Sequence, residues 1–308
     1  MYWLQKNHWY DFLLLTVHTI LFFGDFRMRF PQDTGIPVIT WNVEGKALKD
    51  TPQQECTIGH LQNWGNENPN GVVVLQEVRR FQKEIFENGL DKSCVWKPYH
   101  KNHKNVWHQP GLMVCVDSNH WETRRSRHRD FASQSSYGFL QMEIIDKHTQ
   151  KTYNVMNIHL ESLYVTSKRV PSFPAGGSIS KVLYTMWEKG GFMSIFDLTN
   201  KNAQAQEEQL KEIKYVLGQL KDPTLVLGDF NSPPEQWHHR NFRVGYTDAH
   251  RETGWGFGTT VQRLGVIRSR IDYMYASKQL FWSAPTTVNR DVHCSDHFPT
   301  QSKFDLYQ

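Results

Sequence analysis

The amino-acid sequence lacks several features that mark whole classes of protein. Only four of its 308 residues are cysteine (Cys56, Cys94, Cys115 and Cys294), and none of them forms a C-x-x-C pair or has the spacing of a zinc site. There is no internal repeat, no low-complexity linker and little net charge, since 35 Lys and Arg stand against 31 Asp and Glu. Together with 39% hydrophobic residues, these absences exclude a disordered chain, a collagen and a polytopic membrane protein.

The cysteines are expected to be buried or half-buried free thiols. A single disulfide, between Cys94 and Cys115, remains the alternative if the protein is exported. Cys294 directly precedes the sequence SDH. We do not assign it as a thiol nucleophile, because those neighbouring residues fit a different chemistry.

Residues 1–35 are interpreted as an N-terminal extension. Their apolar run, residues 12–23 (FLLLTVHTILFF), is short for a membrane span, which needs about 20 residues. It has the length of a signal-peptide core, but the following GDFRMRFPQ has no small-x-small cleavage site. Three alternatives stay open: an uncleaved membrane anchor or poor signal, an amphipathic flap on the fold, and an upstream extension before a start at Met28. A cytoplasmic location is favoured, with membrane contact through residues 12–23 or export as alternatives.

Residues 36–308 are expected to form one domain of strands and interspersed helices. Short apolar runs bounded by turn residues predict strands at Ile36–Asn42, Val72–Gln76, Leu112–Val116, Phe139–Ile145, Tyr153–His159, Thr224–Gly228, Ile271–Ala276 and Thr300–Phe304. A stripe of Leu and Ile at helical spacing predicts a helix over 202–220, and a second helix is expected over 80–88. Because strands outnumber helices, we expect an α/β (α+β) fold, a four-layer α/β/β/α sandwich of two mostly antiparallel sheets flanked by helices.

Residues 163–201 interrupt this pattern. They contain SKRVPSFPAGGSIS followed by an aromatic stretch, and they come directly after the strand that ends in His159. Two interpretations stay open: a surface insertion with a small core of its own, and a loop or lid on the substrate side.

Polar side chains stand at the ends of several predicted strands, where a rigid sheet can hold them at one rim. They are Asn42, Glu77, His159, Asp229, Asn231, Asp272, Asp296 and His297. Oxygen ligands of this kind suit Mg²⁺ or Mn²⁺, whereas zinc would need more His or Cys. Imidazoles can bind or protonate a phosphoryl oxygen, and an Asp-x-Asn on a tight turn can hold a water in line with phosphorus. The set predicts a metal-dependent site that hydrolyses phosphoesters without a covalent intermediate.

Six short motifs carry these residues, in the order TWNVEG, LQEV, NIHLES, GDFN, RIDY and SDH. Together they resemble the endonuclease/exonuclease/phosphatase superfamily, the fold of DNase I and exonuclease III. The resemblance extends from Val38 to Phe304. It implies that Glu77 is the principal metal ligand, helped by Asn42, and that Asp296 lies at the metal site or orients a neighbouring side chain.

The resemblance also implies catalytic roles. Asp229 and Asn231 would orient the attacking water, and His297, with Asp272 as its carboxylate partner, would contact the scissile phosphate. Either Asp229 or His297 would be the general base, and the sequence leaves this open. His159 would hydrogen-bond a phosphate oxygen and assist the leaving group.

The superfamily acts on DNA, RNA, lipid and inositol phosphoesters and protein–DNA adducts, so the substrate needs separate clues. LQEVR resembles DNase I, in which the Arg of this motif reaches the DNA, and this makes Arg79 a candidate substrate contact. HLES resembles the tyrosyl-DNA phosphodiesterases, although their GDTN has Thr where this chain has Phe230. The stretch YTDAHRETGWGFGTT with RIDYMYAS resembles a bacterial branch of the superfamily.

Basic and aromatic residues interleave in residues 97–108, where Lys101, Lys104 and Trp107 are candidate substrate contacts. Residues 124–129 and 238–243 form two further basic clusters. Such loops can follow a phosphate backbone and stack on bases, although charged loops are more often simply solvated.

The sequence therefore predicts a Mg²⁺-dependent phosphodiesterase (Mn²⁺ being the alternative ion) that hydrolyses nucleic acid by in-line attack of water. A monomeric DNase I-like DNA endonuclease is the specific form that we expect. Two alternatives remain: a metal-dependent phosphatase or phosphodiesterase acting on lipid or inositol headgroups, and a catalytically silent nucleic-acid-binding module.

Overall fold

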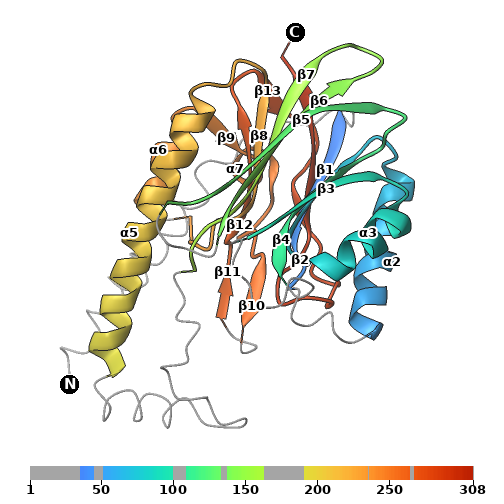
Figure 1. Ribbon diagram of the computed structural model, residues 1–308. Coiled ribbons are helices and arrows are strands. Elements are labelled where there is room, and N and C mark those ends of the chain that lie inside the picture. Colours follow the sequence, from blue (N-terminus) through green and yellow to red (C-terminus); the bar gives the residue numbers. More distant parts are fainter. Residues whose placement is uncertain are drawn as a thin grey trace, which may run out of the picture. The chain divides into compact units, whose positions relative to one another are not determined.

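The computed structural model describes residues 35–44, 51–99, 109–132, 137–162, 191–234, 236–263 and 267–307. The chain divides into two units, residues 1–31 and 32–308, and all the described residues belong to the second unit. Two β-sheets form the centre of this unit, with helices on their outer faces (Figure 1).

The first sheet has seven strands in the order β13-β15-β1-β2-β4-β3, with β14 paired to β15. Its only parallel pair is β1–β2; the other pairs among these described strands are antiparallel. The strands are β1 (Ile36–Asn42), β2 (Val72–Arg79), β3 (Ser93–Pro98), β4 (Pro110–Val116), β13 (Leu280–Trp282), β14 (Thr287–Val288) and β15 (Thr300–Leu306).

The second sheet has six strands in the order β5-β6-β7-β8-β12-β9, in which the described β7–β8 pair is parallel. The strands are β5 (Trp121–Asp130), β6 (Gly138–Asp146), β7 (Thr152–His159), β8 (Thr224–Asp229), β9 (Tyr246–Asp248) and β12 (Asp272–Ser277). A separate hairpin consists of β10 (Val261–Arg263) and β11 (Ile267–Ser269).

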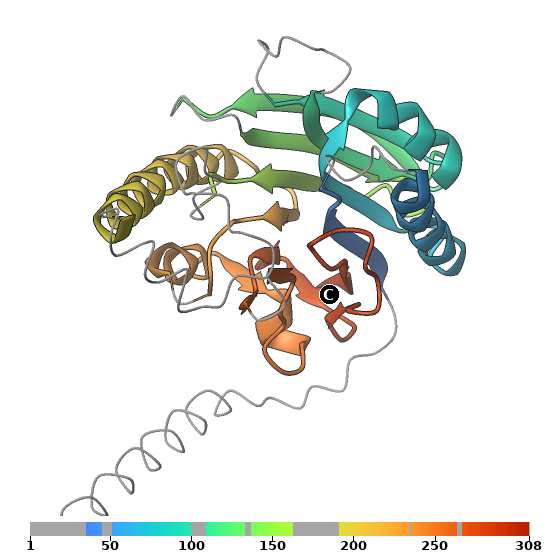
Figure 2. The same cartoon turned by 90° about the horizontal axis from the view of Figure 1, so that it is seen from below.

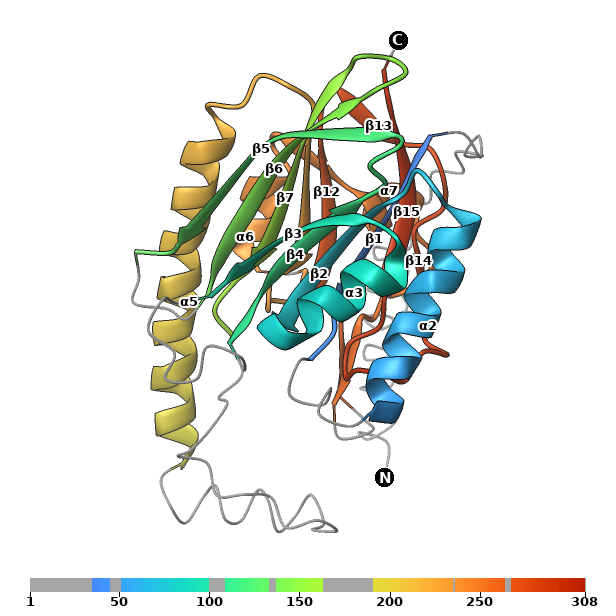
Figure 3. The ribbon, with the colours of Figure 1, turned by 45° about the vertical axis from the view of Figure 1, so that its right-hand side comes forward.

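Helices cover the outer face of each sheet, as Figures 2 and 3 show. The helices of the described residues are α2 (Thr51–Glu67), the 3₁₀ turn η2 (Arg80–Gln82), α3 (Lys83–Leu90), α5 (Gly191–Leu217), α6 (Trp237–Phe242) and α7 (Ala249–Thr253). The short helix α7 is an exception to the outer position, because its Ala249 packs in the cluster between the two sheets. In Figure 3, α2 and α3 lie in front of the first sheet, and α5 runs alongside the second.

Three clusters of buried apolar side chains join the four layers. Alternate residues of a strand point to opposite faces of its sheet, so Val38 of β1 faces the second sheet while Ile39 packs in the cluster beneath α2 and α3. The third cluster lies under α5, where Ile213 packs with Ile158 and Tyr273 of the second sheet. The four-layer α/β/β/α prediction is confirmed, because each sheet buries one face against the other sheet and one face against helices.

The predicted strands are all present, with shifts of a few residues at their ends, but the sequence missed several others. The most instructive is β5, whose sequence WETRRSRHRD has no apolar alternation because most of this edge strand is exposed. The helix predicted over 202–220 belongs to α5, which begins at Gly191 and ends at Leu217. Residues 191–201, assigned to the insertion, are therefore helical, and the rest of that range lies outside the described residues.

The prediction of free thiols is wrong, since all four cysteines are paired. Cys94 and Cys115 are register partners on β3 and β4 and form the disulfide that was the alternative. Cys56 of α2 is joined to Cys294, which lies 238 residues away in the sequence. Such a pairing depends on the path of the chain in space, and the cysteine spacing carries no sign of it.

Among the described residues, no helix has both the length and the hydropathy that a bilayer crossing requires. The apolar run at residues 12–23 lies outside the described residues.

Candidate active site

The ends of strands from both sheets meet at one rim. In the second sheet, Asp229 is the register partner of His159 on β7 and of Asp272 on β12, so three side chains stand in one row. Asn42 is the last residue of β1 in the first sheet, and its Nδ2 donates to Oδ2 of Asp229 across the gap between the sheets, at 3.0 Å.

Asn42 also connects this row to a group of carboxylates. Its Nδ2 lies 3.3 Å from Oε1 of Glu77, and its Oδ1 accepts the backbone N–H of Glu44 at 3.0 Å. Burial raises the pKa of Glu44, and the negative charges of Asp296 and Glu77 raise it further. Glu44 therefore lies close enough to Asp296 and to Glu77 for its charge to be repelled by both.

Glu77 reaches this position through an irregular backbone. Its φ is +61°, and the β2–β4 register shifts between Leu75 and Val78, which marks a bulge at this point. Bulges re-aim side chains at the ends of strands. Glu44, which also has a positive φ of +42°, is a candidate ligand that sequence reasoning missed although it lies inside the motif TWNVEG.

The donors at this end of the rim fit a hard divalent cation. Glu44, Glu77 and Asp296 offer carboxylate oxygens, which Mg²⁺ and Mn²⁺ prefer, and the charge repulsion that raises the pKa of Glu44 is what a cation would relieve. A second group of ligand-type atoms, from Asp229, Asp272 and His297, lies within 4.8 Å of one another and is buried.

His297 stands between two of the aspartates. Its Nδ1 lies 2.9 Å from Oδ2 of Asp272, and its Nε2 lies 3.8 Å from Oδ2 of Asp229. Burial alone would lower the pKa of His297, but the charges of Asp272, Asp229 and Asp296 outweigh burial and raise it. Burial and the nearby charge of Asp272 raise the pKa of Asp229. The imidazole is thus held in its protonated form by the carboxylates around it.

His159 has the opposite environment. It is buried, its Nδ1 lies 2.8 Å from the hydroxyl of Tyr99, and its Nε2 lies 3.5 Å from Oδ2 of Asp229. Burial and the charge of His297 lower the pKa of His159 to about 3. The two histidines of the rim therefore differ in charge at neutral pH.

The turn after β8 places Asn231. The backbone N–H of Asn231 donates to Oδ1 of Asp229 at 2.7 Å, and its side-chain Nδ2 donates to the carbonyl of Leu160 at 3.0 Å. Gly228 precedes this turn with a φ of +137°, and a Cβ there would lie 2.0 Å from the carbonyl oxygen of Ile158. Only glycine lets β7 and β8 approach this closely ahead of the site.

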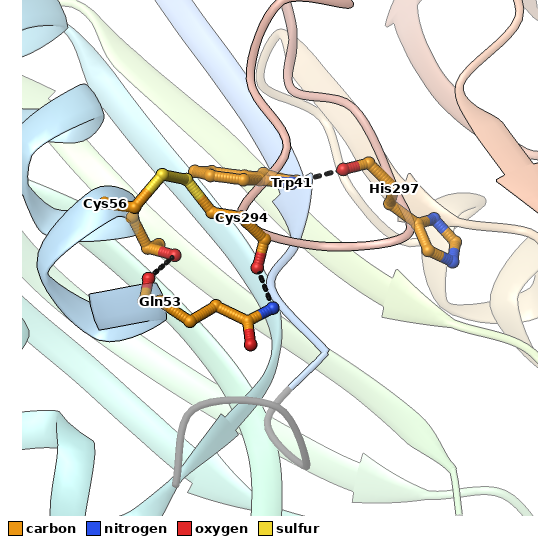
Figure 4. The surroundings of a disulfide bond; sticks show 6 residues. Trp41, Gln53, Cys56, Cys294 and His297 are labelled. Carbon is orange, nitrogen blue, oxygen red and sulfur yellow. Dashed lines mark hydrogen bonds between the residues drawn. A yellow bond between two sulfur atoms is a disulfide. The ribbon is translucent and has the colours of Figure 1, made fainter. Parts of the chain in front are cut away.

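The loop that carries His297 is fastened to the first sheet and to α2 (Figure 4). Trp41 Nε1 donates to the carbonyl of His297 at 2.9 Å. On the other side, the Cys56–Cys294 disulfide ties the loop to α2, and the Gln53 side chain donates to the carbonyl of Cys294. These contacts leave the backbone at His297 little freedom.

Helix α5 holds two of the rim turns through buried amide side chains. Gln206 Nε2 donates to the carbonyls of Glu161 and Phe230, at 2.5 and 3.2 Å, and Gln209 Oε1 accepts the backbone N–H of Glu161 at 2.9 Å. Sequence reasoning used only the apolar stripe of this helix. Gln206 and Gln209 lie on the same face of the helix as the apolar stripe, and both are buried. Polar residues within an apolar stripe were therefore the sequence signal for these contacts.

Of the four predicted substrate contacts, Arg79 lies within the described residues. Arg79 ends β2 and is half-buried, while Lys101, Lys104 and Trp107 lie outside the described residues. His239, assigned to a basic surface cluster, is instead buried, with its ring nitrogens 2.9 Å from Ser232 Oγ and 2.9 Å from the Tyr275 hydroxyl. That part of the prediction is wrong, because a histidine beside arginines can equally be a core residue.

Part of the chain matches the model of a known protein family. The model of the Endonuclease/Exonuclease/phosphatase family matches residues 160–297. No curated protein matches the chain.

Several solved structures share the fold. The human Nocturnin catalytic domain with bound sulfate anion is 16% identical, with a TM-score of 0.62 over 91% of this chain and 95% of that chain. An endonuclease/exonuclease/phosphatase from Bacteroides vulgatus is 14% identical, with a TM-score of 0.61 over 89% and 100%. D. rerio TDP2 complexed with single-strand DNA product is 14% identical, with a TM-score of 0.58 over 89% and 100%.

Proposed function

We propose that this chain is a divalent-metal-dependent phosphodiesterase that acts on nucleic acid. The match of residues 160–297 to the model of the Endonuclease/Exonuclease/phosphatase family and the fold shared with TDP2 support this proposal. The observation that carries the proposal is the grouping of Asp229, His159 and His297 beside the carboxylates of Glu44 and Glu77. A Mg²⁺-dependent DNA endonuclease is the specific activity that we propose.

Glu77, Glu44 and Asp296 would hold the cation, with Asn42 keeping Glu77 in place through its Nδ2. When bound, the cation would stabilise the negative charge that develops on the phosphoryl oxygens.

Asp229 would orient the attacking water. Asn231 N–H and Asn42 Nδ2 each donate to one of its carboxylate oxygens, so the carboxylate is fixed in direction. The raised pKa of Asp229, caused by burial and by Asp272, brings its proton affinity closer to that of a general base at neutral pH. Asp229 is therefore the proposed general base, because the protonated imidazole of His297 has no lone pair with which to take a proton from water.

The two imidazoles would act on the phosphate itself. His297, held protonated by Asp272 and Asp229, would donate to a phosphoryl oxygen and balance its charge. His159, which is neutral, would donate through whichever ring nitrogen carries its proton, and its Nε2 faces the rim beside Asp229.

Nucleic acid as substrate is supported by the fold shared with TDP2, which has been solved with a single-strand DNA product. Half-buried Arg79, at the end of β2 two residues after Glu77, is the candidate phosphate contact within the described residues.

A substrate panel tests the proposal. Plasmid DNA, single-stranded DNA, RNA and phospholipid vesicles are incubated with the protein in Mg²⁺, in Mn²⁺ and in EDTA. We expect nicking of DNA in Mg²⁺, none in EDTA, and a loss of at least about 100-fold in Asp229→Asn and Glu77→Gln. Glu122→Gln, an exposed position on β5, is the matched control and should retain full activity.

Other outcomes of this experiment would contradict the proposed site or the proposed substrate. EDTA-resistant nicking or an active Asp229→Asn protein contradicts the assigned site. Headgroup release from vesicles without nicking favours the lipid alternative, and DNA binding with no hydrolysis of any phosphoester favours a silent binding module.

A further inference from the structure

Tyr99 occupies a place in the rim that the motifs do not predict. It lies directly after β3 and is buried, with 3% of the residue exposed. Its backbone is fixed on both sides, because its N–H donates to the carbonyl of Pro110 at 2.9 Å and its carbonyl accepts from Gln109 Nε2 at 2.6 Å. The ring packs edge-on against His159, with centroids 5.4 Å apart. The tyrosine is thus held rigidly against the imidazole.

The direction of the hydrogen bonds at the Tyr99 hydroxyl follows from its partners. A backbone N–H can only donate, so the hydroxyl oxygen accepts from the N–H of Glu77, at 3.0 Å. The hydroxyl has one proton of its own. Among the described residues, the acceptor it finds is Nδ1 of His159, at 2.8 Å. Nδ1 therefore carries a lone pair, and the ring proton of the neutral imidazole must be on Nε2.

We propose that Tyr99 is a positioning residue that selects the Nε2–H tautomer of His159 and couples this imidazole to the backbone of Glu77. The inference rests on the proposed function for its catalytic consequence, but the tautomer itself is a property of the fold. The hydroxyl links a candidate metal ligand to a candidate phosphate ligand.

The tautomer decides what His159 can do at the rim. With its proton on Nε2, the imidazole donates toward Oδ2 of Asp229, 3.5 Å away, or toward a phosphoryl oxygen that takes this place. With the proton on Nδ1, a lone pair would face these negative groups and repel them. Hydrogen-bond partners that fix the tautomer of metal-bound histidines offer a comparison. Mutating such a partner typically reduces activity about 10- to 100-fold.

The Tyr99→Phe variant removes the hydroxyl and keeps the ring. Tyr153→Phe is the matched control, since Tyr153 is equally buried but packs against Trp121 and Phe304, far from His159 along β7. Thermal unfolding of each variant checks that the fold is intact.

The first measurement is ¹⁵N NMR of the histidine side chains in the metal-free protein, with the His159 signal assigned by its loss in His159→Asn. In the wild type and in Tyr153→Phe we expect Nε2 protonated and Nδ1 unprotonated. In Tyr99→Phe we expect both nitrogens to shift toward a mixture of tautomers. A wild-type spectrum with the proton on Nδ1 overturns the proposal, and this outcome does not need the variant to fold.

The second measurement is steady-state hydrolysis of DNA in Mg²⁺. In Tyr99→Phe we expect kcat to fall about 10- to 100-fold with little change in KM, because the imidazole contributes to the reacting phosphate more than to remote binding. Unchanged kcat, or reduced kcat with the tautomer unchanged, contradicts the positioning role. If the wild type hydrolyses no phosphoester but the tautomer depends on Tyr99, the proposed function fails and the tautomer selection stands.

Discussion

Asp229 and Asp272 are register partners on β8 and β12, and the imidazole of His297 lies between their carboxylates, 2.9 Å from Asp272 Oδ2 and 3.8 Å from Asp229 Oδ2. Burial raises the pKa of Asp229, and the repulsion between its carboxylate and that of Asp272 raises it further. The protonated imidazole compensates for this, and its own pKa is raised by the same charges. The charge balance of the site therefore depends on all three residues together.

Replacing Asp272 by asparagine should expose this dependence. The Asp272→Asn change removes one of the negative charges that raise the pKa of His297, so that pKa should fall. We expect kcat for DNA hydrolysis to drop about 10²- to 10⁴-fold, the usual contribution of a positioned acid or base. Asp222→Asn, at an exposed position after α5, is the control. Retention of wild-type kcat would show that Asp272 is not the functional partner of His297.

The amide clamp from α5 makes a second prediction. Gln206→Ala leaves the buried carbonyls of Glu161 and Phe230 without their donor, and we expect a loss of about 1–3 kcal/mol in the free energy of unfolding. Gln204→Ala, at an exposed position on the same helix, should change little. Urea unfolding compares the two variants. Because Gln206 holds the turns that follow His159 and Asp229, its variant should also lose activity. Equal stability and activity of the two variants would contradict a role of this clamp in the mechanism.

The Cys56–Cys294 disulfide makes a third prediction. It ties the loop of His297 to α2. Replacing both cysteines by serine should lower the free energy of unfolding by up to about 5 kcal/mol and reduce kcat by loosening the loop. The control is the double serine variant at Cys94 and Cys115, which link β3 to β4. That variant should lose stability but retain kcat, and similar kcat values in both would contradict a role of the first disulfide in activity.

The buried pair of Asp248 and Arg270 predicts the acid limit of stability. The two side chains form a bidentate pair with both N···O distances at 2.8 Å. Burial alone would raise the pKa of Asp248, but the charge and hydrogen bonds of Arg270 outweigh it and lower the pKa below its ordinary value. Since the folded-state pKa is depressed, the stabilisation is complete above the unfolded pKa of about 4 and is lost as the pH falls further.

Urea unfolding at several pH values tests this sign. Asp248→Asn leaves Arg270 buried without its partner and should cost about 3–5 kcal/mol at pH 7. The difference between wild type and variant should shrink as the pH falls below about 4. A difference that is constant with pH would show that the charge of Asp248 does not contribute.

Much of this architecture was predictable from local sequence. Alternating or continuous apolar runs, such as that of β8, report on burial because a strand exposes its two faces alternately. The predicted four layers are confirmed, and the model of the predicted family matches residues 160–297. Because these runs also show where strands end, they pointed to the polar residues at the strand ends. In the structure, strand register brings His159, Asp229 and Asp272 into one row.

Other features were not predictable from local sequence. The charged edge strand β5 has no burial pattern. The sequence shows that Gln206 lies on the apolar face of α5, but it does not show which carbonyls its amide reaches. The sequence also did not identify Glu44 as a candidate metal ligand, because hydrophobic periodicity does not show that Glu44 lies near Asp296.

The sequence by itself determined which residue types stand at the end of each strand and therefore the class of chemistry, because local hydrophobic patterns decide where strands end. The tertiary structure alone decided which of these residues touch. It placed Tyr99 between Glu77 and His159, and it joined Cys56 to Cys294, because such contacts depend on how distant segments pack in space. The charge of each rim histidine is likewise a property of the assembled site, since it depends on burial and on neighbours from other strands.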